Sequence, residues 1–293
     1  IMQEAGVPII PGVLPCFAQG TLIATPRGAV PVEALREGET VLTASGGEAP
    51  IKWLGWRQVD CRRQGRPADV WPVRIQPHAF GEGRPARPLL LSPDHAVFLE
   101  GNEAAGAPGV LIPVRYLVNG ASIAQRPVDR VTYWHVELER HAVLLAEGLA
   151  CESYLDTGNR AAFANGGTTV MMSPDFAFRA WHAEACAPLV LDGPRLVAAK
   201  RLLLDRSRGL GHVETDDPAL RLYADGRKIV MRTDGRCLLA ALPARTATVR
   251  LVSRVWKPAE MRAEEDDARS LGVAVARLWL DRRAASLESP GLA

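Results

Sequence analysis

The sequence has few of the features that mark metal-binding, disulfide-rich or membrane proteins. Its five cysteines are scattered, without a C-x-x-C pair, so it lacks the spacing of a zinc site or a disulfide framework. The net charge is only +2 at pH 7, which gives no reason to expect nucleic acid as a partner. No apolar run approaches the ~20 residues of a membrane-spanning helix. We therefore expect no membrane span, no metal and no cofactor.

The composition is that of an ordinary globular protein with room for two domains. Hydrophobic residues make up 47% and charged residues 23% of the 293 positions. From Cys16 to about Tyr154, short apolar segments alternate with Gly, Pro and Asp turns, which predicts an all-β domain. The expected strands cover 41–44, 51–59, 70–76, 89–91, 96–99, 131–138 and 142–145.

The pattern changes twice after this domain. Residues 161–211 contain two helical stretches, 175–184 and 193–206, each with proline at its start, and we interpret them as a helical bridge. Residues 212–283 return to short strands with Asp225-Gly226 as a hairpin signal, which predicts a small antiparallel β-sheet or sandwich domain. We expect an extended leader at 1–15, because its three prolines forbid a helix, and a frayed tail at 284–293.

The most informative stretch starts at Cys16 and runs into an apolar strand and a turn at Gly28. A lone cysteine before a strand is most often a small buried core residue. The surrounding sequence changes this interpretation. Cys16 is followed by G-T-L-I-A-T-P-R-G at 20–28, and 32–42 reads V-x-x-L-x-x-G-E-x-V-L, with Glu39 where the pattern more often has Asp.

These blocks resemble the opening of the Hedgehog/intein (Hint) autoprocessing domain. Two later blocks continue the resemblance in the same order: L-L-L-S-P-D-H at 89–95 and V-T-Y-W-H-V-E-L-E-R-H at 131–141. The string E-S-Y-L-D-T-G-N-R at 152–160 is similar to a group of bacterial Hint-domain proteins. The resemblance covers about half of the chain and implies a Hint-type all-β horseshoe domain over residues 16–160.

The resemblance also implies a site. Cys16 would attack the carbonyl of Pro15, His95 would donate a proton to the departing Cys16 nitrogen, and Ser92 would orient the scissile carbonyl. His141 would line the same cleft. The residue types suit these roles, because a thiol is intrinsically nucleophilic and an imidazole exchanges protons near neutral pH.

Several alternatives stay open at this level. Asp94 either orients His95 or holds the turn, and His135 is a weaker site candidate on the same strand as Tyr133. Cys151 is either a buried structural thiol or an acceptor of the acyl group. The last block has no His-Asn pair, which a splicing intein uses to cut its second junction, so we do not expect full splicing.

We therefore expect a self-processing domain that forms a thioester at Cys16 without splicing. Its substrate would be its own leader or an upstream polypeptide, and water or an external nucleophile would accept the acyl group in a single turnover. The alternative is a catalytically silent Hint scaffold whose C-terminal β domain is an interaction module. Pro15 favours this alternative, because proline restricts the geometry on the leaving side of the bond. The sequence leaves the compartment, the oligomeric state and the ligand of the C-terminal domain open.

Overall fold

The computed structural model describes residues 14–101, 108–167, 174–235, 237–281 and 283–285, and for 174–178 only the backbone. Most of the expected leader (1–15) and of the expected frayed tail (284–293) therefore lies outside the described residues. The chain divides into two compact units. The N-terminal unit comprises Ile1–His212 and Glu260–Glu264, and the C-terminal unit comprises Val213–Ala259 and Glu265–Ala293.

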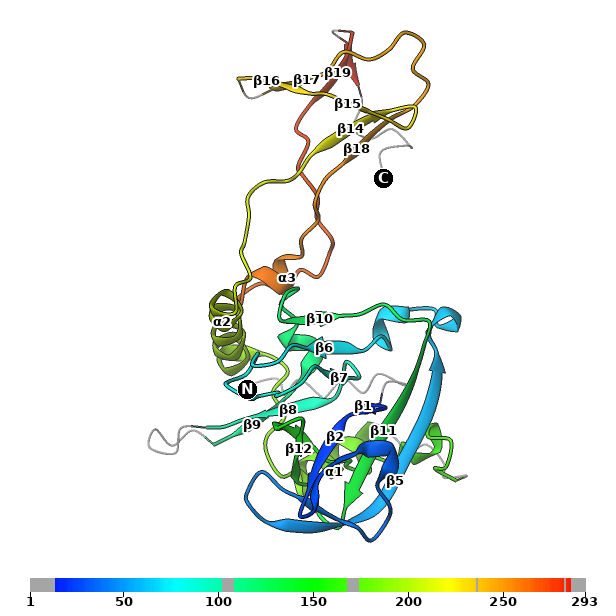
Figure 1. Ribbon diagram of the computed structural model, residues 1–293, viewed down its shortest axis with the longest axis vertical. Helices are drawn as coiled ribbons and strands as arrows, with labels where there is room; N and C mark the ends of the chain where they lie inside the picture. The colour runs from blue at the N-terminus through cyan, green and yellow to red at the C-terminus, as the bar shows by residue number, and fades with distance from the viewer. Residues whose placement is uncertain (1–13, 102–107, 168–173, 236, 282, 286–293) are drawn as a thin grey trace. The chain divides into compact units, whose positions relative to one another are not determined.

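A seven-stranded antiparallel sheet carries the start of the described chain. Its strands are β1 (Phe17–Ala18), β4 (Thr40–Leu42), β5 (Glu48–Asp60), β6 (Val73–Ile75), β7 (Leu89–Leu91), β10 (Ile123–Gln125) and β11 (Arg130–Leu138), in the order β10-β6-β7-β1-β11-β5-β4. Figure 1 shows β5 and β11 as two long neighbouring ribbons. Phe17 of β1 lies opposite Leu91 on one side and Trp134 on the other. Cys16 therefore enters the sheet at its central strand.

A six-stranded antiparallel sheet completes the β structure of this unit. It consists of β2 (Leu22–Thr25), β3 (Gly28–Pro31), β8 (Ala96–Leu99), β9 (Val110–Pro113), β12 (Val143–Ala146) and β13 (Leu149–Glu152), in the order β3-β2-β12-β13-β8-β9. β12 and β13 form a hairpin whose turn residues, Glu147 and Gly148, both have positive φ (50° and 83°). Two such residues give the turn type whose twist matches a β-hairpin. Ser92 and His95 lie between β7 and β8, where the chain passes from one sheet to the other.

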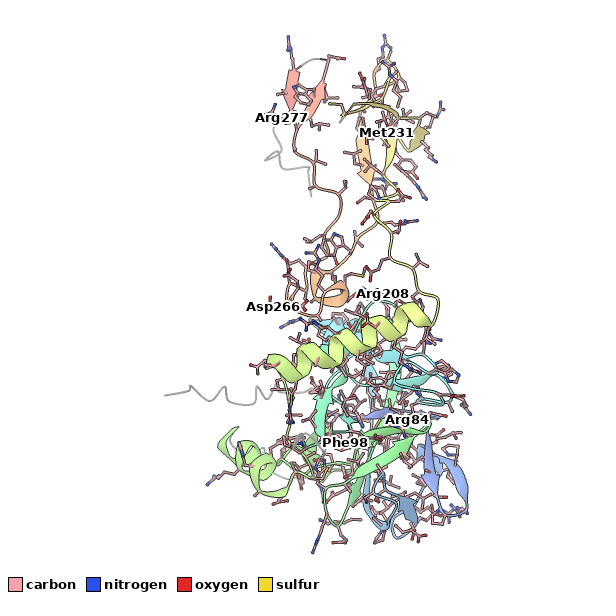
Figure 2. All side chains as sticks on the ribbon, turned by 90° about the vertical axis from the view of Figure 1, so that its left-hand side faces the viewer. Arg84, Phe98, Arg208, Met231, Asp266 and Arg277 are labelled. Atoms are coloured by element: carbon pink, nitrogen blue, oxygen red, sulfur yellow. The ribbon has the colours of Figure 1, made fainter. Side chains whose placement is uncertain are left out.

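Two helices follow the β structure, as the sequence predicts. α1 (Pro174–Glu184) and α2 (Gly193–Gly209) match the expected helical stretches, and Pro194 occupies the first turn of α2. α2 (Figure 2) packs within the N-terminal unit. Its Ala199 and Leu203 side chains belong to the hydrophobic core of that unit. The short 3-10 helices are Val32–Ala34, Cys61–Arg63, Pro67–Asp69, Val114–Leu117 and Arg160–Ala162. Among the described residues, no helix is long and apolar enough to cross a membrane.

The C-terminal unit contains small antiparallel sheets. Its strands are β14 (Arg221–Ala224), β15 (Arg227–Ile229), β16 (Arg232–Asp234), β17 (Cys237–Leu239), β18 (Val249–Val252), β19 (Leu278–Leu280) and β20 (Arg283–Ala285). The short helix α3 (Pro258–Met261) contains residues of both units. Asp225 and Gly226 form the expected hairpin turn between β14 and β15, both with positive φ. β20 pairs with β19, so described strand structure extends two residues into the expected tail.

Candidate functional site

Cys16 lies in the interior of the N-terminal unit, directly before β1. Its side chain is fully buried in a cluster with Leu14, Val70, Tyr133 and Tyr154. The preceding residue, Pro15, is half-buried. The peptide bond between Pro15 and Cys16 is therefore held where the chain enters the core, and its nitrogen must find a hydrogen-bond acceptor inside the protein.

Ser92 supplies that acceptor. Its hydroxyl accepts a hydrogen bond from the Cys16 N–H at 2.7 Å and donates one to the carbonyl oxygen of Leu14, also at 2.7 Å. The Ser92 N–H in turn donates to the carbonyl oxygen of Cys16 at 2.9 Å. We call these three bonds the Ser92 clamp. The hydroxyl contacts the amide nitrogen of the Pro15–Cys16 bond, whereas the sequence led us to expect a contact with the carbonyl of that bond.

The environment of the Cys16 thiol keeps it protonated. Burial raises its pKa to about 12, although the charge of Arg57 and a hydrogen bond with its guanidinium act in the opposite direction. Arg57 lies on β5 and also faces the ring of Tyr133. The resting site therefore holds a thiol beside a guanidinium that favours the thiolate.

His95 is fully buried next to Cys16. Its ring centroid lies 4.3 Å from that of Phe17, the residue after the cysteine, and 5.1 Å from that of His135. Burial lowers the pKa of His95 to about 3, while backbone groups of Glu152 and Cys16 beside the ring act against this effect. His95 is therefore neutral at physiological pH. It is able to take up a proton and pass it on during a reaction, but it is not protonated at rest.

His135 shares this buried cluster. Its Nδ1 accepts a hydrogen bond from the Val136 N–H at 3.2 Å, and its ring lies 5.2 Å from that of Tyr154. Burial lowers its pKa well below the ordinary value. The structure thus brings His135 next to His95, which the sequence indicated only weakly.

His141 has different surroundings. Its Nδ1 accepts a hydrogen bond from the Cys186 N–H at 3.0 Å, and its Nε2 faces Oε2 of Glu152 at 3.9 Å. The Trp181 ring packs edge-on against it at 5.6 Å. Burial lowers the pKa of His141 to about 4. Because Nδ1 is an acceptor, the neutral ring carries its hydrogen on Nε2, towards Glu152.

Glu152 lies between His141 and the backbone that follows His95. Its side chain is fully buried, and Oε1 accepts a hydrogen bond from the N–H of Ala96, the residue after His95, at 2.6 Å. Burial raises the pKa of this carboxyl to about 8. The carboxyl is therefore mainly protonated at neutral pH, which is unusual for a glutamate.

An open groove of about 1280 Å³ lies beside His141. Arg84, Phe98, Cys186 and Leu202 also line it, and Figure 2 labels the first two. Cys16, Ser92 and His95 are not among its lining residues. The nucleophile candidate is thus enclosed, and the His141 side chain, which is 0% exposed, is also closed off from the groove beside it.

The comparison with protein families identifies this arrangement. Residues 15–158 match the family model described as "Hint domain". Residues 15–158 are a Hint domain. The match begins one residue before Cys16 and spans both sheets, so it confirms the resemblance and the mainly β fold predicted from the sequence. Hint domains are a self-processing family, and the candidate residues Cys16, Ser92, His95 and His141 all lie inside the matched range.

Solved structures of inteins are similar to the Hint domain. A bacterial intein-like domain from Clostridium thermocellum is 13% identical with a TM-score of 0.34, covering 47% of this chain and 98% of that one. The gp41-1 intein is 12% identical (TM-score 0.32; 47% and 98% covered), and a DnaB intein from Synechocystis sp. PCC 6803 is 9% identical (0.32; 48% and 99%). A search of the curated proteins found no match.

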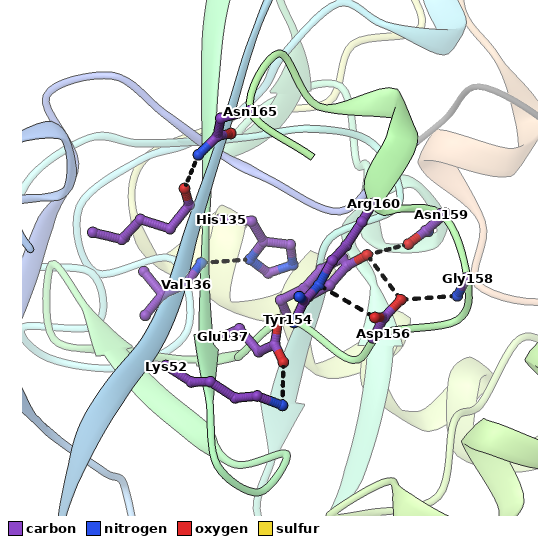
Figure 3. A network of polar contacts seen from close by, with 11 residues as sticks. Lys52, His135, Val136, Glu137, Tyr154, Asp156, Gly158, Asn159, Arg160 and Asn165 are labelled. Atoms are coloured by element: carbon purple, nitrogen blue, oxygen red, sulfur yellow. Dashed lines mark hydrogen bonds and ion pairs between the residues drawn. The ribbon is translucent and has the colours of Figure 1, made fainter. Parts of the chain in front are cut away.

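The end of the Hint domain is fixed by a network of polar contacts (Figure 3). Glu137 of β11 pairs with Lys52 at 2.9 Å and with Arg160, which also pairs with Asp156 at 3.2 Å. The Tyr154 hydroxyl bonds Asn159 within the same D-T-G-N-R string. The residues after β13 at 156–160 therefore hold Tyr154, which belongs to the same buried cluster as Cys16.

The structure also places the remaining candidates. Asp94 pairs with Arg115 and is not bonded to His95, so within the described residues it stabilises the turn. Cys151 is fully buried, and burial raises its pKa well above the ordinary value, which fits a structural thiol. Among the described residues, no group of three or more His, Cys, Asp or Glu side chains is arranged to hold a metal ion.

Sequence reasoning missed two residues of the site, Arg57 and Glu152. Arg57 lies in a strand segment whose alternation marks it only as one of several polar positions. Glu152 ends an apolar strand, where a glutamate is normally exposed. The one sequence signal for a role of Glu152 was its position as the first residue of the E-S-Y-L-D-T-G-N-R string at 152–160.

Proposed function

We propose that the Hint domain cleaves the peptide bond between Pro15 and Cys16 through a thioester at Cys16. The observation that carries this proposal is the Ser92 clamp, because the Ser92 hydroxyl accepts the N–H of that bond at 2.7 Å and so fixes the nitrogen that departs. The buried thiol beside Arg57 and the neutral imidazole of His95 support the same chemistry.

In the first step, Sγ of Cys16 attacks the carbonyl carbon of Pro15. The C–S bond forms, the C–N bond breaks, and the thiol proton passes to the leaving nitrogen. Arg57 favours the thiolate needed for attack, and neutral His95 accepts the thiol proton and passes it on. Ser92 orients the leaving nitrogen, since its hydroxyl oxygen accepts the Cys16 N–H while its own hydrogen is donated to the Leu14 carbonyl.

In the second step, a nucleophile attacks the thioester carbonyl. With water, the products are a carboxylate at Pro15, a free Cys16 thiol and a proton. The enclosed position of Cys16 supports water, rather than a large nucleophile, as the acyl acceptor. A single cleavage event then separates the preceding polypeptide from the Hint domain.

The direct test is a full chain with a reporter protein fused before Ile1. We expect the fusion to break into a fragment that ends at Pro15 and a chain that begins at Cys16. We expect Cys16→Ala to abolish cleavage. Cys61→Ala, which changes another buried cysteine of the same cluster, should cleave like the wild type. Mass spectrometry of both fragments locates the bond. An intact wild-type fusion, or equal cleavage in Cys16→Ala, would refute the proposal.

A silent scaffold is the second candidate. The enclosed thiol with a pKa of about 12 favours it, because such a thiol is unreactive at rest. The C-terminal unit has apolar side chains on β18 that are more than a third exposed, Val249 at 46% and Val252 at 38%, as expected for an interaction module. An intact fusion under all conditions would favour this function.

A further inference from the structure

The C-terminal unit has little hydrophobic core. In its described strands, Leu222 and Ala224 are the only buried residues. Of the described large apolar side chains that are more than a third exposed, only Trp56, Leu202 and Leu210 belong to the N-terminal unit, and all the others belong to the C-terminal unit. Small domains with so little core are usually stabilised by association, and exposed apolar side chains gathered on one unit mark an interaction site.

One edge of the three-stranded sheet in this unit is open for pairing. The strand order is β15-β14-β18, so β15 and β18 are both edge strands (Figure 1). The N–H of Asp225, directly after β14, donates to the carbonyl oxygen of Thr248, directly before β18, at 3.0 Å. In an antiparallel pair, successive residues point their backbone groups to opposite sides of the strand. The N–H and C=O groups of Val249 and Leu251 therefore point away from β14, and the described chain offers them no hydrogen-bond partner.

The charges on the two edges differ. β15 carries two adjacent cations, Arg227 and Lys228, and charged side chains are a common device that keeps an edge strand from pairing. β18 reads V-R-L-V, and its one cation, Arg250, lies over the ring of Tyr223 at 5.4 Å. Leu251 is 36% exposed. The β18 edge is therefore mainly apolar and lacks the protection that β15 has.

We propose that the C-terminal unit binds a second copy of this chain through β18. In this dimer, β18 of one protomer pairs antiparallel with β18 of its partner, and the two-fold axis passes between the two Leu251 residues. Each Leu251 then donates its N–H to the carbonyl oxygen of the other, so both outward groups gain a partner. The three-stranded sheets join into one sheet with the order β15-β14-β18-β18-β14-β15. This association does not depend on the proposed cleavage.

The charges select this register. With Leu251 on the axis, Arg250 of one protomer lies opposite Val252 of the other. With the axis at Arg250, the two arginines would face each other, and like charges directly opposite destabilise a strand pair. Pairing of β15 with itself about Lys228 meets the same repulsion.

The apolar side chains favour the same arrangement. Leu222 lies opposite Leu251. Ala224 lies opposite Val249, so these four side chains share one face of the sheet. Two-fold pairing keeps this face on one side of the joined sheet, so the apolar stripe continues across both protomers while Arg250 lies on the other face. The β18 edge thus complements a second copy of itself in hydrogen bonds, charge and apolar contact.

The first test is a disulfide across the proposed axis. It uses the full chain with Cys16→Ala, so that cleavage does not interfere, and with Cys186→Ser and Cys237→Ser, which remove the exposed thiols. A hydrogen-bonded antiparallel pair has a Cα–Cα distance of about 5.5 Å, which a disulfide spans. Leu251→Cys should therefore give a covalent dimer on mild oxidation. The matched control is Val230→Cys, because Val230 is 87% exposed and random collisions would crosslink it more readily than position 251.

The second test measures association without new cysteines. In sedimentation equilibrium, the Cys16→Ala chain should have twice the mass of one chain. Leu251→Lys should weaken the dimer by about tenfold or more, because it places two ammonium groups opposite each other at the axis. Leu238→Lys is the control, since Leu238 is 50% exposed but lies on β17 of another sheet, and it should dimerise like the Cys16→Ala chain.

A monomer at every concentration, or no crosslink with Leu251→Cys, overturns the proposal and assigns the β18 edge to a different protein. Equal crosslinking of Val230→Cys and Leu251→Cys, or equal association of Leu251→Lys and Leu238→Lys, also overturns it. If Leu251→Lys does not fold, the crosslink alone decides, because Leu251→Cys leaves the edge uncharged.

Discussion

Replacing Ser92 by alanine removes the hydroxyl of the Ser92 clamp and leaves two buried backbone groups without their partner. These are the Cys16 N–H and the Leu14 carbonyl, each 2.7 Å from Oγ. Ser92 is 1% exposed, so bulk water does not replace the hydroxyl. A buried polar group that loses its partner costs about 1–3 kcal/mol. We expect Ser92→Ala to lower the free energy of unfolding of the N-terminal unit by about 4 kcal/mol, the middle of the sum of about 2–6 kcal/mol for the two groups.

The measurement is urea unfolding of the full chain carrying Cys16→Ala, so that cleavage does not interfere. Hydrogen exchange in peptides that contain β1 and β7 separates the N-terminal unit from the C-terminal unit. Ser92→Thr keeps the hydroxyl and should recover most of the loss. The control is Ser45→Ala, whose hydroxyl lies on the surface and bonds Thr43. A loss below about 1 kcal/mol for Ser92→Ala, or one equal to that of the control, would refute the clamp as a stabilising element.

Two further predictions follow from buried titratable groups. Burial lowers the pKa values of His95, His135 and His141, so each makes the folded state bind fewer protons than the unfolded state below pH 6.5 and lowers stability by up to about 1.4 kcal/mol per pH unit as pH falls. The raised pKa of Glu152 acts in the opposite direction between about pH 4.5 and 8 and offsets one histidine, so stability should still fall from pH 6.5 towards pH 4.5. Thermal unfolding between pH 7 and pH 4.5 measures this, and a constant Tm would contradict it. Iodoacetamide should label the exposed thiols of Cys186 and Cys237 in the native chain and spare Cys16, Cys61 and Cys151, as peptide mass spectrometry would record. Native labelling of Cys16 would contradict its enclosure.

Much of the fold follows from local patterns. The strands expected at 89–91 and 96–99 have those bounds in the structure, and α1 begins one residue before its expected start. The Asp225-Gly226 hairpin forms as predicted, since only a few residue types adopt positive φ readily. Strands β9, β10 and β13 were not expected, because short apolar runs next to turns do not reveal their pairing partners.

The site could be predicted in its residue types but not in its contacts. The motifs named Cys16, Ser92 and His95, and the structure brings them together at the junction of two sheets. The sequence did not indicate that the Ser92 hydroxyl bonds the amide nitrogen, because this depends on where β1 lies between β7 and β11. The burial of Glu152 likewise depends on tertiary structure, since β13 lies between β12 and β8.

The most direct test of the central claim is to trap the thioester. The reporter fusion is incubated with dithiothreitol, and the intact mass of the released fragment is measured. We predict a fragment that ends at Pro15 and carries one dithiothreitol joined with loss of water, because a thiol displaces Cys16 from the acyl group. Release of the same fragment from Cys16→Ala, or no release at all, would contradict thioester formation at Cys16.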